Sequence, residues 1–318
     1  MTRVFGACRL LAIAAAAFPM LLLGALWAPR ALADDVAIGA AANYAVLFEG
    51  GGSGNHLNIT NVTVNGNIGV GGAGLATDSG PSTVNGAINF SAANTGQFAN
   101  NNGSDVITGG VSYSVALVTS ALDTVNSLNT TLGGVPGTSI SINLSGSATQ
   151  TINESAGTLF TTGGVTYRVF NITGFNTTNG NTINVVGDGS GDPVVFNFTG
   201  NANFNNQVTL TGLTSGQVLW NFVGGSSLSG GPTLQINDNG YNNPGNLVQG
   251  IFLDPNGSVS VVNTNLFGDV FGGDSHDMQI VSGDTINRAM VTPEPSSLAL
   301  LVAGLFGIVG FTRRKLNS

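Results

Sequence analysis

The chain carries little charge of either sign. Charged residues make up 8% of its 318 residues, against about 25% in an average globular protein. Eight residues are Lys or Arg and 16 are Asp or Glu. A nucleic-acid-binding surface needs a basic patch that so few bases cannot supply, so we expect no nucleic-acid partner. The Glu- and Lys-rich heptads of a coiled coil are excluded for the same reason.

Cysteine is nearly absent, and the single Cys8 lies in a segment typical of a secretory signal. Two arginines precede an uncharged apolar run over residues 10–27, and Ala31 and Ala33 are small residues at the positions that signal peptidase reads. We predict a signal peptide over residues 1–33; a retained membrane anchor is the alternative. The mature chain then has neither a thiol nor a disulfide, although it enters an oxidising compartment.

The C-terminus holds a second targeting unit. Pro293-Glu294-Pro295 precedes an apolar run over residues 298–311 and then a basic tail. This order resembles the PEP-CTERM sorting signal of exopolysaccharide-producing Gram-negative bacteria. The resemblance implies that a membrane protease, exosortase, cuts near the tripeptide. A buried core helix is the alternative interpretation of residues 293–318.

The apolar run has 14 residues and is short for a membrane span, which takes about 20. We nevertheless expect it to hold the chain transiently in the inner membrane, with the basic tail on the cytoplasmic side. The residues expected in the membrane are Leu298, Leu300, Leu301, Leu305, Phe306, Ile308 and Phe311, and the basic stop is Arg313, Arg314 and Lys315.

Residues 34–292, between the two ends, are strongly acidic. They keep two bases, Arg168 and Arg288, against 15 acidic residues, a net charge of −13. Such a charge favours solubility and repels polyanions. Contact with an anionic matrix polymer would therefore need a bridging cation.

The pattern of this body predicts one mainly β domain. Short alternating segments such as 58–64, 139–144, 182–186 and 207–211 are separated by Gly and Asn turns. Two architectures fit, a β-solenoid and a β-sandwich. We favour the solenoid, in which each coil buries its inward side chains against the next and small polar residues stack outward.

One segment has helical spacing instead. Apolar residues between Val115 and Leu132 recur every three or four positions, which predicts an amphipathic helix of about five turns. Ser114 is the expected N-cap and Gly133-Gly134 the expected end. The outer face should carry Thr119, Asp123 and Thr130.

The body contains five segments that carry a family resemblance: residues 42–47, 62–70, 217–223, 250–261 and 265–273. They resemble segments of the choice-of-anchor A family and of the bacterial ice-binding-type β-solenoids, and the last three resemble the final two coils. The resemblance implies a right-handed β-helix with a long helix packed alongside, and it does not imply a catalytic site.

Ice-binding members often present a flat face of regular Thr or small-residue ladders. Thr209-Leu-Thr211 is the only clean Thr-x-Thr that we find in a strand followed by a plausible flat surface. Asn197 and Asn221 are expected at the matching places on neighbouring strands.

Oxygen-ligand clusters in Gly-rich turns suggest weak calcium candidates. Asp188 and Asp192 share one loop, and Asp238 lies in another. Neither matches the EF-hand spacing, so we favour turn capping by these carboxylates and expect no cofactor. His276 with Asp274 and Asp277 is a weaker cation candidate that we expect to be a solvated surface loop.

Catalysis has little support in the sequence. A polysaccharide lyase needs a cation to stabilise its enolate-like intermediate, and the body offers only Arg168 and Arg288. A glycoside hydrolase needs two facing carboxylates, whereas these are scattered over turns. We therefore predict a non-catalytic secreted or cell-envelope protein associated with the surface or exopolysaccharide matrix. Ice binding and a polysaccharide-active enzyme are the alternatives.

Overall fold

The computed structural model describes residues 35–52, 54–224, 233–240, 242–243, 245–273 and 276–289. All of them belong to one compact unit, Ala33–Pro293. The predicted signal peptide, the Pro293–Pro295 tripeptide, the apolar run and the basic stop lie outside the described residues. Within the described part of the chain, no helix is both long and apolar enough to cross a membrane.

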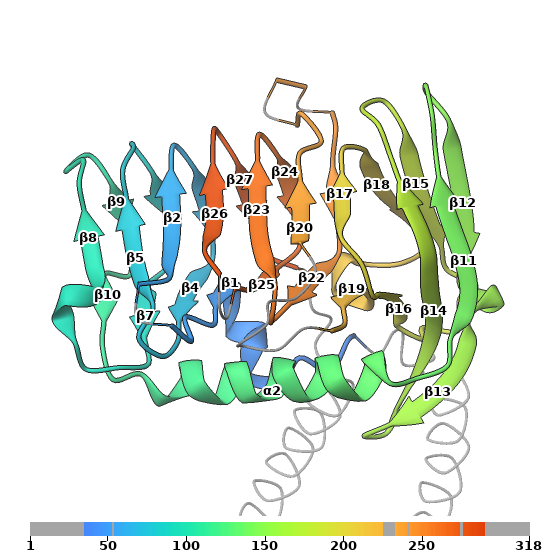
Figure 1. Ribbon diagram of the computed structural model, residues 1–318, viewed down its shortest axis with the longest axis horizontal. Helices are drawn as coiled ribbons and strands as arrows, with labels where there is room; N and C mark the ends of the chain where they lie inside the picture. The colour runs from blue at the N-terminus through green and yellow to red at the C-terminus, as the bar shows by residue number, and fades with distance from the viewer. Residues whose placement is uncertain are drawn as a thin grey trace, which may run out of the picture. The chain divides into compact units, whose positions relative to one another are not determined.

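The unit is a β-solenoid of stacked coils with one long helix along it (Figure 1). Every strand pairing is parallel except that of β13 with β14. One coil contributes a strand to each of three long faces, which a β-sandwich with antiparallel hairpins does not do. The prediction of a solenoid with one long helix is confirmed.

The first face is an eleven-stranded sheet beside the helix. In spatial order it contains β10 (Val111–Ser112), β7 (Ile88–Phe90), β4 (Asn67–Val70), β1 (Tyr44–Phe48), β25 (Val270–Gly272), β22 (Ile251–Asp254), β19 (Val218–Phe222), β16 (Val194–Phe198), β14 (Val165–Asn176) and β11 (Thr138–Asn143), and β13 (Thr158–Thr162) pairs with β14.

The other faces are a seven-stranded sheet and a pair of smaller sheets. The seven strands are β17 (Ala202–Phe204), β20 (Thr233–Ile236), β23 (Ser258–Val262), β26 (Met278–Val281), β2 (His56–Thr60), β5 (Leu75–Asp78) and β8 (Phe98–Asn100). The six-stranded sheet holds β21 (Val248–Gln249), β24 (Asn265–Phe267), β27 (Thr285–Asn287), β3 (Thr63–Asn65), β6 (Thr83–Val84) and β9 (Val106–Ile107), and the three-stranded sheet holds β12 (Thr149–Asn153), β15 (Thr182–Val186) and β18 (Gln207–Thr211). Four short 3-10 turns complete the described elements: Gly39–Asn43, Thr95–Gln97, Glu154–Ala156 and Ser215–Gln217.

The order of the coils in space differs from their order in the sequence. Strands β1 to β10 form one end of the stack, the helix then runs back along it, and the later strands return toward the start (Figure 1). As a result β25, β26 and β27 pair with β1, β2 and β3. The segments that resemble the final coils are last in sequence but lie inside the stack.

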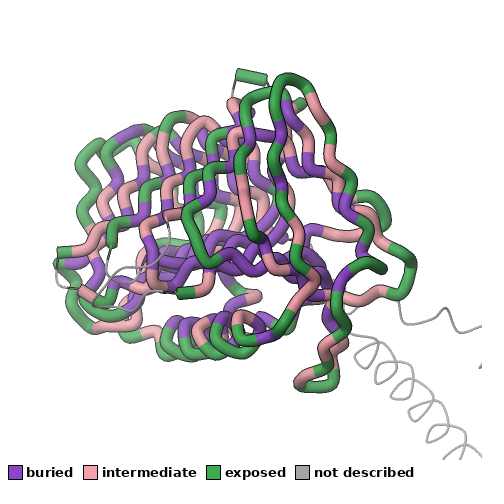
Figure 2. The backbone as a smooth tube through the Cα atoms, turned by 45° about the vertical axis from the view of Figure 1, so that its right-hand side comes forward, coloured by how far each residue is buried: buried purple, intermediate pink, exposed green. Residues whose placement is uncertain are grey.

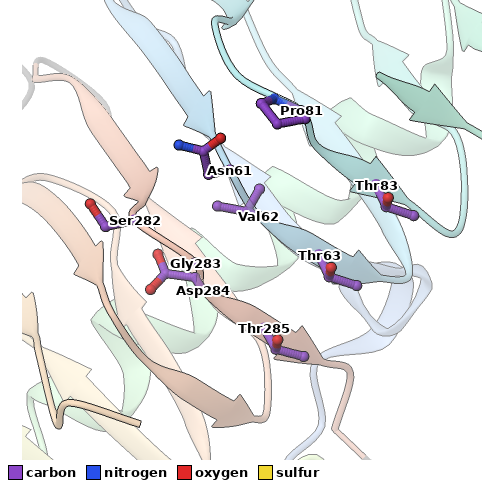
Figure 3. Close-up of a pocket in the computed structure, with 9 residues that line it drawn as sticks. All are labelled: Asn61, Val62, Thr63, Pro81, Thr83, Ser282, Gly283, Asp284 and Thr285. Carbon is purple, nitrogen blue, oxygen red and sulfur yellow. The ribbon is translucent and has the colours of Figure 1, made fainter. Parts of the chain in front are cut away.

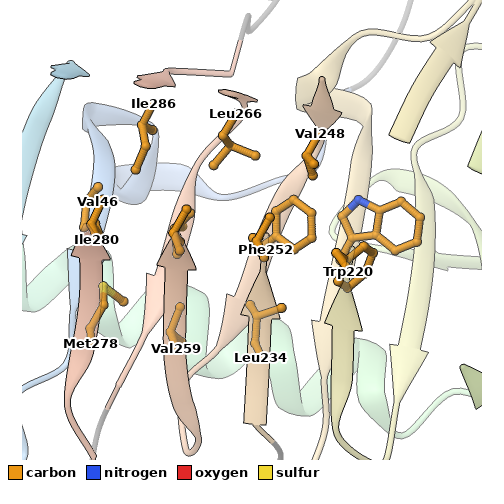
Figure 4. Packing of buried hydrophobic residues seen from close by; sticks show 14 of the residues in the cluster. Val46, Trp220, Leu234, Val248, Phe252, Val259, Leu266, Met278, Ile280 and Ile286 are labelled. Carbon is orange, nitrogen blue, oxygen red and sulfur yellow. The ribbon is translucent and has the colours of Figure 1, made fainter. Parts of the chain in front are cut away.

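Two apolar layers hold the unit together. The interior of the coils contains a stack of aromatic rings, in which Phe196 and Trp220 have ring centroids 4.4 Å apart. Trp220 also stacks with Phe252 of the next coil, and Figure 4 shows both in the interior. The Trp220 indole N–H donates to the Gln249 carbonyl over 3.1 Å, which satisfies its one donor. Buried positions alternate with less buried ones along many strands, as the tube in Figure 2 shows.

The second layer lies between the helix α2 (Ala116–Gly133) and the eleven-stranded sheet. The inner face of α2 is buried, and Thr119, Asp123 and Thr130 on its outer face are exposed as predicted. The predicted cap is wrong. Val115 occupies the N-cap position without a side-chain hydrogen bond, and Ser114 has a positive φ of 59°.

An asparagine ladder joins this helix to the sheet. Asn197 donates to the Leu132 carbonyl over 2.8 Å, Asn221 donates to Asn197, and Asn129 donates to Asn221. The sequence interpretation placed Asn197 and Asn221 on the same face as Thr209. They belong instead to β16 and β19 and face α2, because the two segments occupy different sides of the coil.

Candidate binding face

Three neighbouring strands of the six-stranded sheet repeat one short motif. Side by side lie Thr285-Ile-Asn287 of β27, Thr63-Val-Asn65 of β3 and Thr83-Val-Asn85, whose first two residues form β6 and whose Asn85 directly follows it. The middle residue of each is fully buried in the solenoid interior, so Thr and Asn project outward. We call the six outward residues the Thr–Asn face.

The asparagines of this face are connected to one another. The Asn85 amide donates to Asn65 Oδ1 over 2.7 Å, and the Asn65 amide donates to Asn287 Oδ1 over 2.8 Å. Such side-chain ladders fix the amide orientations before any ligand arrives, so the face is pre-organised for hydrogen bonding.

The threonines line a groove of about 580 Å³. Figure 3 shows Thr63, Thr83 and Thr285 in a row, with Asn61, Pro81 and Ser282 at the corner of the coil. Strands in a sheet are about 4.8 Å apart, so the row repeats at that interval. The groove therefore presents a regular polar surface.

Asp284 is a buried residue that lines the groove at the corner of the coil. Its carboxylate accepts hydrogen bonds from the backbone N–H groups of Thr264 over 2.7 Å and Val281 over 2.8 Å. Burial raises the pKa of Asp284 to about 7. Because it binds backbone groups of its own chain, it positions the corner and is not presented to a ligand.

A second polar surface lies on the three-stranded sheet. Thr209 and Thr211 both donate to Asn184 Oδ1, over 3.3 and 3.1 Å. Thr151 pairs with Asn184 in register on the other side, within the motif Thr149-Gln150-Thr151 of β12. The three-stranded sheet therefore holds a second Thr-x-Thr in a strand beside Thr209-Leu-Thr211.

The calcium candidates occupy two separate loops. Arg168 lies between Asp192, at 3.0 Å, and Asp188, at 3.5 Å. A hydrogen bond from the Ser190 backbone N–H, helped by Arg168, lowers the pKa of Asp188. The protein's own cation thus sits between the two carboxylates.

Asp238 follows β20 at another corner, where it is buried and accepts from the Gly240 N–H over 3.0 Å. Among the described residues there is no group of three or more His, Cys, Asp or Glu placed to hold a metal. His56 and Asp277 do meet, because the His56 backbone N–H donates to the Asp277 carboxylate over 2.7 Å.

The Thr–Asn face escaped prediction from the sequence. The first two copies of its motif are 20 residues apart, which is one coil, and each precedes a glycine. The third copy lies 200 residues further on and is brought alongside only by the pairing of β27 with β3.

The comparisons with known proteins agree with this architecture. A family model described as "Putative Ice-binding-like adhesive domain" matches residues 31–280. The chain belongs to this ice-binding-like adhesive domain family. A second model, the PEP-CTERM protein-sorting motif, matches residues 291–315. Both resemblances drawn from the sequence are thereby confirmed, and the sorting motif supports export and membrane-anchored sorting of this adhesive-domain protein.

One solved structure shows the same fold. An ice-binding protein from an Antarctic bacterium of the Flavobacteriaceae has a TM-score of 0.52 at 16% identity, over 82% of this chain and 49% of that one. The chain thus spans about half the length of that protein. The ice-binding protein of the Antarctic ascomycete Antarctomyces psychrotrophicus has a TM-score of 0.46 at 14% identity, over 81% of this chain and 100% of that chain. No curated protein matches the sequence.

Proposed function

We propose that this adhesive-domain protein is an exported, non-catalytic binder of the hydrated exopolysaccharide matrix, which it contacts through the Thr–Asn face. The signal peptide is removed by signal peptidase. The C-terminal helix then holds the chain in the inner membrane until an exosortase releases or transfers it to the cell surface or matrix. The family and the sorting motif support export and adhesion.

The observation that carries the binding proposal is the Thr–Asn face itself. Its threonine hydroxyls and its linked amides can both donate and accept hydrogen bonds. Sugar hydroxyls have the same dual character, so a polymer chain can make many weak contacts with the face. No charged side chain belongs to the face, which suits a ligand with an uncharged surface.

Export is tested by fractionating cells that express the full chain. We expect it in the membrane and extracellular fractions. A Pro293→Ala, Glu294→Ala, Pro295→Ala variant should accumulate in the membrane, because the exosortase then lacks its recognition site. Full-length protein found in the cytoplasm would refute the proposal.

Adhesion is tested by co-sedimentation of the mature protein with exopolysaccharide extracted from the producing cells. Thr63→Glu puts a carboxylate into the groove and should reduce the sedimented fraction at least about tenfold. Thr209→Glu, on the three-stranded sheet, is the matched control with the same charge change. Equal sedimentation of both variants with the wild type would exclude the Thr–Asn face as the contact.

Ice binding is the second candidate, favoured by the regular spacing of the Thr row along β27, β3 and β6. It predicts thermal hysteresis and inhibition of ice recrystallisation by the mature protein, both abolished by Thr63→Glu. Absence of both effects in the wild type would dismiss it.

A further inference from the structure

One aromatic side chain stands beside the Thr–Asn face in full register with it. Phe267 of β24 pairs with Asn287 of β27, which pairs with Asn65 of β3. Phe267 is 39% exposed and is the one aromatic among the large hydrophobic side chains that stay exposed in the described residues. Its exposure is imposed by the fold, because the preceding Leu266 occupies the interior position.

The ring and the amide row form one continuous strip. The strip runs over four strands, from β24 to β6. The three spacings between these strands are about 4.8 Å each, which makes the strip about 14 Å long. It begins with an apolar ring and continues through Asn287, Asn65 and Asn85, whose amides are held in line by their mutual hydrogen bonds. A matching ligand is elongated and has an apolar face followed by hydroxyl groups.

The charges around the strip narrow the chemical class of the ligand further. Asp284 lines the groove but is buried, and its carboxylate already accepts hydrogen bonds from two backbone N–H groups. Arg288 follows Asn287, and its positive charge acts on the buried Asp269, which accepts a hydrogen bond from the Ala289 backbone N–H over 3.1 Å. The formal net charge of the body is −13, and it stays strongly negative when a few buried carboxyls are protonated. This negative charge repels polyanions and so disfavours an acidic polymer.

We propose that Phe267 and the Asn287–Asn65–Asn85 row form a binding subsite for an uncharged polysaccharide, with the C–H face of one sugar ring stacked on Phe267. The stack uses the electron-rich face of the aromatic ring. The following sugars lie along the amides, which exchange hydrogen bonds with their hydroxyls. The inference rests on the proposed adhesive function and specifies its ligand.

The test uses the mature protein and two soluble probes, dextran as the uncharged polymer and alginate as the anionic one. Retardation in affinity gels that contain each polymer gives the dissociation constant. We expect dextran to bind and alginate to bind at least about tenfold more weakly. Phe267→Ala should raise the dissociation constant for dextran at least about tenfold, which corresponds to about 1.4 kcal/mol of binding free energy.

Leu159→Ala is the matched control. It removes a side chain that is 58% exposed on β13, away from the strip, and should leave the dissociation constant unchanged. Asn65→Leu interrupts the amide row and should weaken binding without removing the ring. Thermal unfolding of each variant confirms that it is folded.

The outcomes separate the two proposals. Equal binding of dextran by the wild type and Phe267→Ala would overturn the subsite, and alginate binding as tight as dextran binding would overturn the uncharged ligand class. If the wild type sediments with the native matrix but does not bind dextran, the inference is overturned while the adhesive function stands. Failure to sediment with the matrix would refute the function itself.

Discussion

At the scale of single residues, the acidic chain buries many of its carboxyl groups. Asp254, Asp269, Asp284, Asp78 and Asp238 are each at most 1% exposed. Burial removes the water that stabilises a carboxylate and so raises the pKa of each. The values reach about 8 for Asp254, about 7 for Asp269 and Asp284, and about 6 for Asp78 and Asp238. The protein therefore keeps some carboxyls neutral near neutral pH.

These shifts predict that the fold is more stable in acid than in base. A carboxyl whose pKa is raised by folding stabilises the native state fully below its unfolded pKa near 4, and this contribution is lost as the pH rises through the folded pKa. For Asp254 the window runs from about pH 4 to about pH 8. Asp254→Asn should abolish this part of the pH dependence, on the order of 5 kcal/mol over the whole window.

Urea unfolding at pH 5 and pH 9 measures the effect. The unfolding free energy of Asp254→Asn minus that of the wild type should be more favourable to the variant at pH 9 than at pH 5. Asp123→Asn, on the exposed face of α2, is the control and should shift both values equally. An unchanged pH dependence in Asp254→Asn would show that the carboxyl is not buried as described.

At the scale of elements, α2 is attached to the sheet by hydrogen bonds as well as by apolar packing. Asn129 is buried and donates both to Asn221 Oδ1, over 2.7 Å, and to the Phe222 carbonyl, over 2.8 Å. Asn197 meanwhile binds the Leu132 carbonyl, one of the groups that a helix end leaves without an intrahelical donor. The ladder thus fixes where the helix ends against the sheet.

Asn129→Ala should cost about 1–3 kcal/mol of unfolding free energy, because two buried acceptors lose their donor. Chemical denaturation measures the loss. Ser127→Ala, exposed on the same helix, should be neutral or slightly stabilising since alanine is the better helix former. A neutral Asn129→Ala would mean that water replaces the lost donor.

The sequence predicted elements well where the signal is local. The apolar spacing placed the helix within one residue of Ala116–Gly133. It failed at the cap, because Ser114 takes a positive φ and its backbone N–H bonds to the Ala92 carbonyl. It also joined residues 58–64 into one strand, whereas Asn61, with φ of 56°, turns a corner between β2 and β3. Asparagine tolerates this backbone conformation, so its presence alone did not reveal the corner.

At the scale of the whole molecule, the sequence could not reveal which coils are neighbours. Local alternation does not encode the pairing of β2 with β26, which joins residues more than 200 positions apart. We call the pairing of β25, β26 and β27 with β1, β2 and β3 the seam. The Thr–Asn face depends on it, since Thr285 and Asn287 come from β27 and Thr63 and Asn65 from β3. The candidate site is therefore a product of the closed stack and not of any one segment.

The seam should make the first and the last described strands of the solenoid unfold together. Ile280 of β26 pairs with Ile59 of β2, and both are fully buried. Ile280→Ala should cost about 2–5 kcal/mol and should speed hydrogen exchange in β2 as much as in β26. Ile183→Ala, equally buried in β15, should act first on its own neighbours β12 and β18, because coils in a solenoid are coupled mainly to adjacent coils. If Ile280→Ala left the protection of β2 unchanged, the seam would contribute nothing to stability, and the Thr–Asn face would have to be held by the N-terminal coils alone.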